Sequence, residues 1–243
     1  MPHELWITGL FNRYLAGPAN SLLSAIRYPP QDPRNPWSDW LVCEILVVLF
    51  VLFFFGLARR RFSVDRPGKT QHVLELFYEF FRASTEEVAG HDGLRYVPFF
   101  GTIFLFILFM NLIGLIPGFD SPTMFPMVPL GLAVATFFFY HFTGIRAHGP
   151  AYIKQFLGPF WWLALLMFPI EIISHFARPL SLTVRLFANM FAGERVYLTF
   201  LTLTKLLVPV IFIGLHLFVS FLQAYIFMLL AMVYVGGAVA HEH

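Results

Sequence analysis

Residues 181–194 read SLTVRLFANMFAGE, and they place one arginine, Arg185, inside a long apolar part of the chain. The run WWLALLMFPIEIISHFARPL precedes this stretch, and RVYLTFLTLTKLLVPVIFIGLHLFVSFLQAY follows it. An arginine at the centre of a membrane helix costs roughly 2.5–3.5 kcal/mol on insertion scales. We therefore expect Arg185 to serve a function rather than packing.

The composition predicts an all-α polytopic membrane protein. Hydrophobic residues make up 58% of the chain, charged residues 12%, and the mean hydropathy is +0.71, whereas soluble chains are about 25% charged. The net charge of +2 is small, and we expect no nucleic-acid partner. The single cysteine, Cys43, stands in an apolar run, which predicts a buried side chain rather than a disulfide or a reactive thiol.

The apolar runs predict five membrane spans within one membrane domain, residues 39–243. These spans cover about 40–58, 97–118, 124–144, 160–202 and 208–240. The last two runs are longer than a span requires, so we expect long, tilted helices there. Residues 70–89 place apolar side chains at i, i+3, i+4 spacing with charges opposite, which predicts an amphipathic helix on the membrane surface.

Residues 1–38 are expected to form a separate N-terminal segment outside the cytoplasm. The chain begins MPHELWITGLFNRYL, without a basic region or a cleavage site, so we predict a short interfacial helix rather than a cleaved signal peptide. A proline-rich extended stretch, YPPQDPRNPW, should follow it.

The distribution of basic residues predicts the orientation. Five Lys or Arg residues follow the first span closely and two precede it (Arg59, Arg60, Arg61, Arg66 and Lys69, against Arg27 and Arg34). The loop FDSPT after the second span has neither, and the loop after the third contains Arg146, His148 and Lys154. The positive-inside rule therefore places the N-terminus outside and, after five crossings, the C-terminus in the cytoplasm.

Polar residues form a stripe on the fourth predicted span. Glu171, Arg178 and Arg185 are spaced by seven, Asn189 follows after four, and His175 and Ser181 lie on or beside the same face. Glu194 comes nine residues after Arg185 and should face the opposite side. On the fifth span His216, Ser220 and Gln223 share one face.

Arg185 has no evident carboxylate partner in the chain. Glu171 would be about 21 Å away along a straight helix, and Glu194 points elsewhere. We therefore expect the partner of Arg185 on another protein. The pattern indicates two offset polar half-paths for protons, one at Glu171 and one at Glu194 and His216, with a fixed positive charge between them.

Four other polar residues also stand in or near the predicted spans. Asn111 is typical of a hydrogen bond between helices. His175 fits either a functional site or a solvated helix end, and Arg178 fits either a site or a side chain that reaches the interface. Glu44 fits a site, a pair with a neighbouring helix, or solvent at the outer end of its span.

The stretch RLFANMFAGE at 185–194 closely resembles the signature of subunit a of the rotary F-type ATP synthase, and LQAYIF at 222–227 resembles the last-helix motif of that family. PGKTQHVLE at 67–75, MNLIGLIPG at 110–118 and the HEH ending extend the resemblance. It implies that Arg185 is the stator arginine facing the carboxylates of the rotating c-ring. It further implies an outer half-channel at Glu194 and His216, polar neighbours of the arginine at Asn189 and Gln223, and a cytoplasmic half-channel near Glu171 and Ser181.

The resemblance implies a non-catalytic subunit in a bacterial inner membrane, surrounded by lipid. Its partners would be the c-ring, the subunit b peripheral stalk and the rest of the ATP synthase. We expect no cofactor or metal, and the chain has no GxxxxGK[ST] phosphate-binding loop.

A self-contained proton-coupled secondary transporter would usually show an internal repeat, which we do not find. A haem protein would need paired axial ligands, whereas His141, His175 and His216 are scattered singly. The coupling ion, proton or sodium, is not fixed by this chain.

Overall fold

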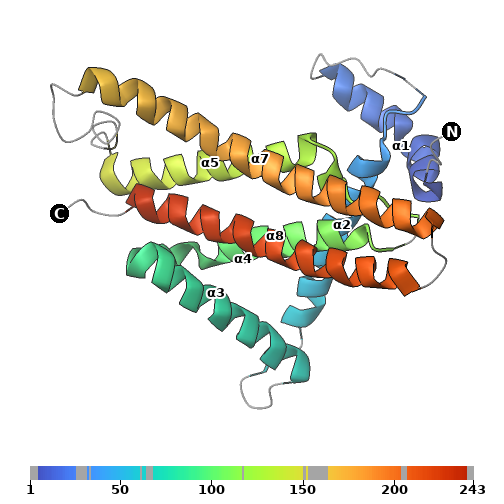
Figure 1. Cartoon of the computed structure of the whole chain (residues 1–243), viewed down its shortest axis with the longest axis horizontal. Helices are drawn as coiled ribbons and strands as arrows, with labels where there is room; N and C mark the ends of the chain where they lie inside the picture. The colour runs from blue at the N-terminus through green and yellow to red at the C-terminus, as the bar shows by residue number, and fades with distance from the viewer. Residues whose placement is uncertain are drawn as a thin grey trace.

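The computed structural model describes residues 5–25, 32, 34–60, 62–63, 68–116, 118–149, 152, 164–203 and 207–239. All regular secondary structure in these ranges is helical, which confirms the predicted all-α class. The long helices are α1 (Trp6–Ala25), α2 (Asp39–Arg59), α3 (Lys69–Gly93), α4 (Val97–Ile113), α5 (Met127–His148), α7 (Ala164–Leu203) and α8 (Leu207–Val239) (Figure 1). The predicted start of the fourth span, the HEH ending and the basic residues Arg27, Arg61, Arg66 and Lys154 lie outside the described residues.

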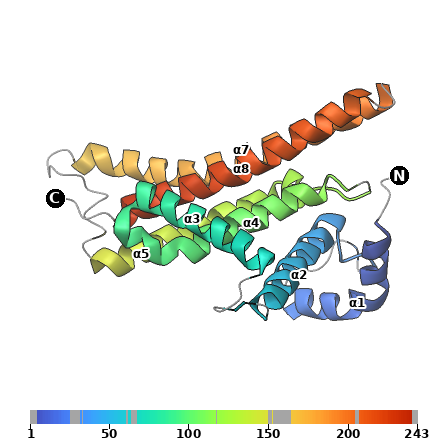
Figure 2. The same cartoon turned by 90° about the horizontal axis from the view of Figure 1, so that it is seen from below.

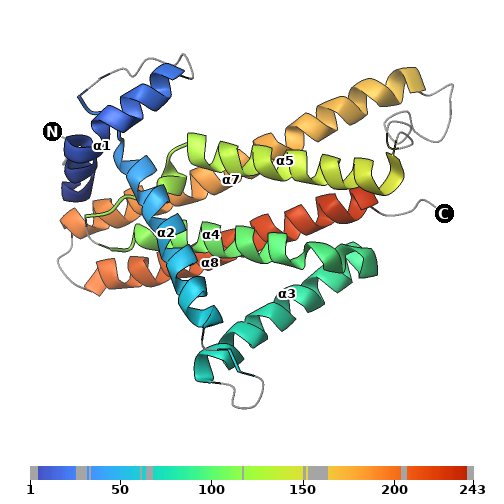
Figure 3. The same cartoon turned by 180° about the vertical axis from the view of Figure 1, so that it is seen from behind.

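Helix α8 is the centre of the packing. It contacts α3, α4, α5 and α7, and it runs lengthwise beside α4 and α7 in both side views (Figures 1 and 3). Its fully buried side chains recur at helical spacing (Ala224, Phe227, Met228, Ala231, Met232 and Val235). This one face of α8 supplies much of the apolar core.

The outward faces of the bundle are apolar, as lipid requires. Leu52 and Phe53 on α2 are 65% and 66% exposed, and Phe138 on α5 is 65% exposed. Among the described residues, four stretches are long and apolar enough to cross a membrane, in α2, α3–α4, α5 and α8. Helix α7 is not among them, because its polar stripe lowers its hydropathy. The chain is therefore a multi-pass membrane protein, and the count of five spans, which includes α7, stays a prediction.

The last two helices are longer than a bilayer is thick. Helix α7 has 40 residues and α8 has 33. At 1.5 Å per residue they extend about 60 and 50 Å, against a hydrocarbon core of about 30 Å. They contact each other where the chain passes from α7 to α8 and diverge toward the other end, where α5 lies between them (Figures 1 and 2). A strong tilt would bring both within the membrane.

Two helix ends differ from the ends of the predicted spans. Helix α4 ends at Ile113, before the predicted span end near 118, and the chain turns back to pack Ser121 against Gly114. Helix α5 continues past the predicted span end near Gly144 to His148, and the ring of Tyr152 packs against Gly144. Gly149, with a φ of 58°, ends α5 in the left-handed region that favours glycine.

Helix α1 folds back onto the start of α2. The backbone N–H of Leu5 donates to Asp39 Oδ1 at 3.1 Å, and the side chain of Asn12 exchanges two hydrogen bonds with the backbone of Trp37. At 20 residues, α1 is longer than the short interfacial helix that we predicted.

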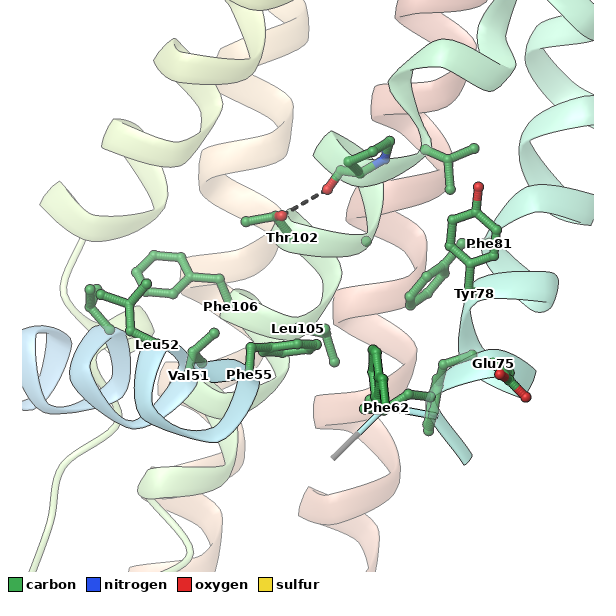
Figure 4. Close-up of a pocket in the computed structure, with 16 residues that line it drawn as sticks. Val51, Leu52, Phe55, Phe62, Glu75, Tyr78, Phe81, Thr102, Leu105 and Phe106 are labelled. Atoms are coloured by element: carbon green, nitrogen blue, oxygen red, sulfur yellow. Dashed lines mark hydrogen bonds between the residues drawn. The ribbon is translucent and has the colours of Figure 1, made fainter. Parts of the chain in front are cut away.

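Helix α3 is the predicted amphipathic helix. Its C-terminal end lies next to the start of α4, and its N-terminal end diverges from α4 and α8 (Figure 3). Gly90, with a φ of 69°, lets the chain turn from α3 toward α4. Most of the apolar face of α3 stays open, and Leu76 is 67% exposed. Between α2, α3 and α4 lies an apolar groove of about 810 Å³, lined by side chains such as Leu52, Phe55 and Phe106 (Figure 4).

Candidate functional site

Arg185 lies on α7 at the edge between its buried and exposed faces. Leu182, Leu186 and Met190 turn into the core, while Val184, one residue before Arg185, is 53% exposed. The Arg185 side chain is half-buried, and its Nη2 lies 3.5 Å from Ser181 Oγ. Within the described part of the chain, no carboxylate lies within salt-bridge distance of this guanidinium.

One turn further along α7, Asn189 connects this site to α8. Its side-chain amide donates to Gln223 Oε1 at 2.7 Å. Gln223 is 2% exposed, whereas Asn189 is exposed, so the bond extends from the core to the protein surface beside Arg185. Ser181, Arg185, Asn189 and Gln223, four of the predicted residues, thus form one continuous polar site, which we call the Arg185 site.

Glu194 and His216 lie in a second, enclosed region. They are 8% and 6% exposed, and Ser220, one turn beyond His216, is fully buried. A Cβ added at Gly193 would lie 3.1 Å from His216 Nδ1, so the missing side chain lets the imidazole approach α7. Among the described residues, Glu194 Oε2, His216 Nε2 and Ser220 Oγ have no hydrogen-bond partner. Leaving buried polar atoms unpaired is costly, which is typical of a site that exchanges protons or water.

The loop between α4 and α5 closes this second region. Thr123 donates to Asn111 Oδ1 at 2.6 Å, Asn111 donates to the Ser220 carbonyl at 3.3 Å, and Ser121 donates to the Met110 carbonyl at 2.9 Å. This buried network holds the short helix η2 (Pro122–Met124) against α7. Asn111 therefore makes the hydrogen bond between helices that we predicted.

Two loop residues that we did not predict adjoin Glu194. The backbone N–H of Ser121 faces the Glu194 carboxylate, and the carboxylate of Asp120 lies within its electrostatic reach. Burial first, and then Asp39, raises the pKa of Asp120, while Arg195 lowers it. We call Asp120, Ser121, Glu194, His216 and Ser220 the Glu194 site.

A third polar group surrounds His175 near the start of α7. The His175 ring is 2.8 Å from Tyr140 O–H through Nδ1 and 3.3 Å from Glu171 Oε1 through Nε2. His141 bonds Tyr152 O–H at 2.9 Å through Nδ1, and its ring centroid is 5.0 Å from that of His175. Arg178 lies over the rings of Tyr140 and Tyr234, at 5.9 and 5.1 Å. We call Tyr140, His141, Tyr152, Glu171, His175 and Arg178 the His175 cluster.

The His175 cluster shows the surroundings of two residues that had more than one interpretation. His175 is 9% exposed, so it is not a solvated histidine at a helix end. Arg178 is half-buried against two aromatic rings. Tyr140, His141 and Tyr152 were missed, because they form no periodic polar stripe of the kind that marks α7. Matching the depth of His141 and His175 in adjacent spans could have suggested their proximity.

The predicted site residues thus fall into three groups along α7. Glu171 belongs to the His175 cluster, Glu194 and His216 to the Glu194 site, and the other four to the Arg185 site. Glu44 is half-buried on α2, away from α7 in sequence, and its role stays open. In the described ranges, no group of three or more His, Cys, Asp or Glu side chains could hold a metal ion.

Comparison with known proteins assigns the family. Residues 41–236 match the ATP synthase A chain family. The chain is 55% identical to ATP synthase subunit a of Solibacter usitatus, over 96% of this chain and all of that protein. It is 51% identical to the Koribacter versatilis subunit over the full length of both, and 44% identical to the Aquifex aeolicus subunit over 73% of this chain and 86% of that one. The self-contained transporter gains no support, and the chain belongs to the ATP synthase A chain family, as a non-catalytic, proton-translocating subunit of the membrane sector.

Proposed function

We propose that the chain is the stator of a rotary motor, in which Arg185 separates two offset proton half-channels. The Glu194 site would form the outer half-channel, with Glu194 and His216 as its titrating pair. Glu171 and Ser181 would serve the cytoplasmic half-channel, and Asn189 and Gln223 would support the arginine. The observation that carries this proposal is the position of Arg185, at the rim of α7 between two separate polar groups and without a carboxylate partner among the described residues.

The exposed face of α7 fits the rotating c-ring as its partner. Phe176, Leu180 and Val184 recur every four residues on this face and are 65%, 62% and 53% exposed. This apolar stripe lies beside Arg185 and Asn189. A ring of apolar helices could slide along it while each ring carboxylate passes the guanidinium. The subunit b stalk and the remaining ATP synthase subunits would contact other faces.

The mechanism is electrostatic. A protonated ring carboxylate is neutral and tolerates lipid. Near Arg185 the positive charge favours the ionised form, so the proton leaves through one half-channel and is replaced from the other after the carboxylate has passed. The same charge opposes a direct proton hop between the half-channels, by roughly 4 kcal/mol at 4 Å with an effective dielectric of about 20.

Arg185→Ala and Arg185→Lys test these two roles. The alanine variant should abolish ATP synthesis and leave or raise passive proton leak. The lysine variant should suppress leak but fail to sustain normal synthesis, because an ammonium lacks the planar fork that binds a carboxylate through two bonds. Phe138→Leu, at an exposed position on α5 away from this face, is the control and should keep both properties near wild type.

Leak is measured as passive proton uptake into vesicles stripped of the soluble head, and synthesis in intact vesicles, at matched amounts of complex. If Arg185→Ala still made ATP at a normal rate, the rotary role assigned to this residue would be wrong. If it leaked no more than Arg185→Lys, the barrier role would be lost.

The chain would lie in a bacterial inner membrane with its N-terminal helix outside the cytoplasm. The relatives described above are bacterial proteins, which supports a bacterial inner membrane. The C-terminal ends of α2 and α5 carry basic residues (Arg59 and Arg60; Arg146 and His148). The positive-inside rule then places these ends in the cytoplasm and α1 outside.

A further inference from the structure

We propose that His175 is a positioning residue that holds the Glu171 carboxylate at the cytoplasmic half-channel through a tautomer fixed by Tyr140. The inference rests on the proposed function, since it gives Glu171 its role there. It adds two residues, His175 and Tyr140, that the sequence pattern did not assign to the proton path.

The geometry around His175 engages both ring nitrogens. Nε2 lies 3.3 Å from Glu171 Oε1, and Nδ1 lies 2.8 Å from Tyr140 O–H. An ionised carboxylate can only accept hydrogen bonds, so Nε2 must carry the proton that points to Glu171. In a neutral ring Nδ1 then accepts from the phenol. Tyr140 thereby selects the tautomer that serves Glu171, as orienting partners do for other functional histidines.

Neighbouring side chains hold Tyr140 and His175 in place. Tyr140 is 1% exposed, and its ring lies against Arg178. The His141 ring packs beside His175 and is itself bonded to Tyr152 O–H. Tyr152 packs against Gly144, where any larger residue would collide with its ring. These neighbours come from α5, α7 and the chain after α5, so the imidazole has little freedom to rotate.

Glu171 is the exposed end of this arrangement. Its side chain is 33% exposed, against 11% for His175. At 100° per residue, Glu171 and Arg185 lie within about 40° of each other around α7. The 3.3 Å contact with His175 Nε2 therefore orients an accessible carboxylate on the arginine side of the helix. An unrestrained glutamate would distribute over several rotamers and lose part of this alignment.

The chemistry of glutamine gives a sharp test. A glutamine side chain can place an amide N–H near the position of Nε2, and its carbonyl can accept from Tyr140 O–H. It cannot carry a proton between the two groups. His175→Gln should therefore restore most of the function that His175→Ala loses. A histidine that relays protons by titrating would not be replaced by glutamine.

The experiment uses the complete ATP synthase in inverted membrane vesicles, whose outer face is the cytoplasmic side. ATP synthesis is measured against external pH at matched amounts of complex. His175→Ala should lower the rate about tenfold, a usual effect of removing an orienting partner, and should change the pH profile. His175→Gln should retain most of the rate and the wild-type profile, and Tyr140→Phe should be intermediate. Phe142→Leu, an exposed position on α5, is the control.

A double-mutant cycle identifies the residue through which His175 acts. In a Glu171→Gln background, His175→Ala should cost little more, because the carboxylate that it orients is gone. Additive losses in log rate would overturn the inference, and so would a glutamine variant as defective as the alanine variant. A uniform loss at every pH would indicate a structural role only. Arg185→Ala in the same vesicles distinguishes the stator role of Arg185 from the positioning role of His175. If Arg185→Ala abolishes synthesis while His175→Ala keeps a normal rate, only the positioning role is wrong.

Discussion

Asn189 and Gln223 are joined by a 2.7 Å hydrogen bond between α7 and α8, one turn from Arg185. The two residues lie 34 positions apart in the chain, and neither has a charge. Their bond fixes the two long helices against each other at the depth where the arginine would meet the ring. Hydrogen bonds between membrane helices average about 0.6 kcal/mol and reach about 1.7 kcal/mol, so this one can set local geometry without dominating stability.

Substitutions at this pair should therefore be strongly non-additive. Asn189→Leu and Gln223→Leu each break the same bond and should each lower the rate of ATP-driven proton pumping. The double variant should cost little more than the worse single variant. Thr199→Ala on α7 is the control, because its hydroxyl bonds only the Arg195 carbonyl of its own helix. If the two losses simply added in log rate, the residues would act independently.

Gly193 offers a second test, because a side chain there would meet His216. The added Cβ of Gly193→Ala would lie 3.1 Å from His216 Nδ1, closer than usual packing allows. The ring must then move within a buried region, and overpacking of this kind costs typically 1–3 kcal/mol. We expect Gly193→Ala to impair proton-driven synthesis in the same way as His216→Ala.

The matched control for Gly193 is Gly214→Ala. Gly214 lies on α8 two residues before His216, and no atom lies within 4 Å of a Cβ added there. ATP synthesis and the amount of assembled complex should both stay near wild type in this variant. A Gly193→Ala complex with normal synthesis would show that His216 does not need its present position.

The positions of the polar residues around α7 follow largely from helical periodicity. The spacing of Glu171, Arg178 and Arg185 predicted one polar stripe, and the structure places all three on the same side of α7. Glu194, predicted to face away from Arg185, is buried under the loop that contains Ser121. These features are local to one helix, so a period of 3.6 residues is enough to find them.

Features made by several segments did not follow from periodicity. Tyr140, His141 and Tyr152 reach His175 only because α5 packs on α7 and Gly144 makes room for a ring. The end of α4 also differs from the predicted end of the span, because the chain leaves the helix at Gly114 and Ser121 and Thr123 hydrogen-bond back to α4. Both failures involve tertiary contacts that override the local pattern of hydropathy.

The orientation can be tested by labelling single cysteines. In a Cys43→Ala background, Ser21→Cys on α1 and Ala147→Cys on α5 place thiols at exposed positions near the two predicted sides. A membrane-impermeant maleimide should label Ser21→Cys in right-side-out vesicles and Ala147→Cys in inverted vesicles. Labelling of both from the same side would contradict the positive-inside assignment.

The Glu194 site permits a test of shared function between its two titratable residues. Glu194 Oε2 and His216 Nε2 are both buried and find no hydrogen-bond partner in the part of the chain that the structure describes. Gly193 brings the imidazole against α7 next to Glu194. If both belong to one proton path, each single variant, Glu194→Gln or His216→Ala, should lower ATP synthesis by about 10²-fold, the lower end of what a positioned proton donor or acceptor contributes.

The exchange variant, Glu194→His with His216→Glu, keeps one carboxylate and one imidazole in the same buried space. Because the pair titrates as a unit, the exchange should do less harm than the sum of the single losses. Synthesis rates, proton pumping and the amount of assembled complex should be compared across the four proteins. Strict additivity of the losses in log rate, with assembly intact, would show that Glu194 and His216 serve separate paths.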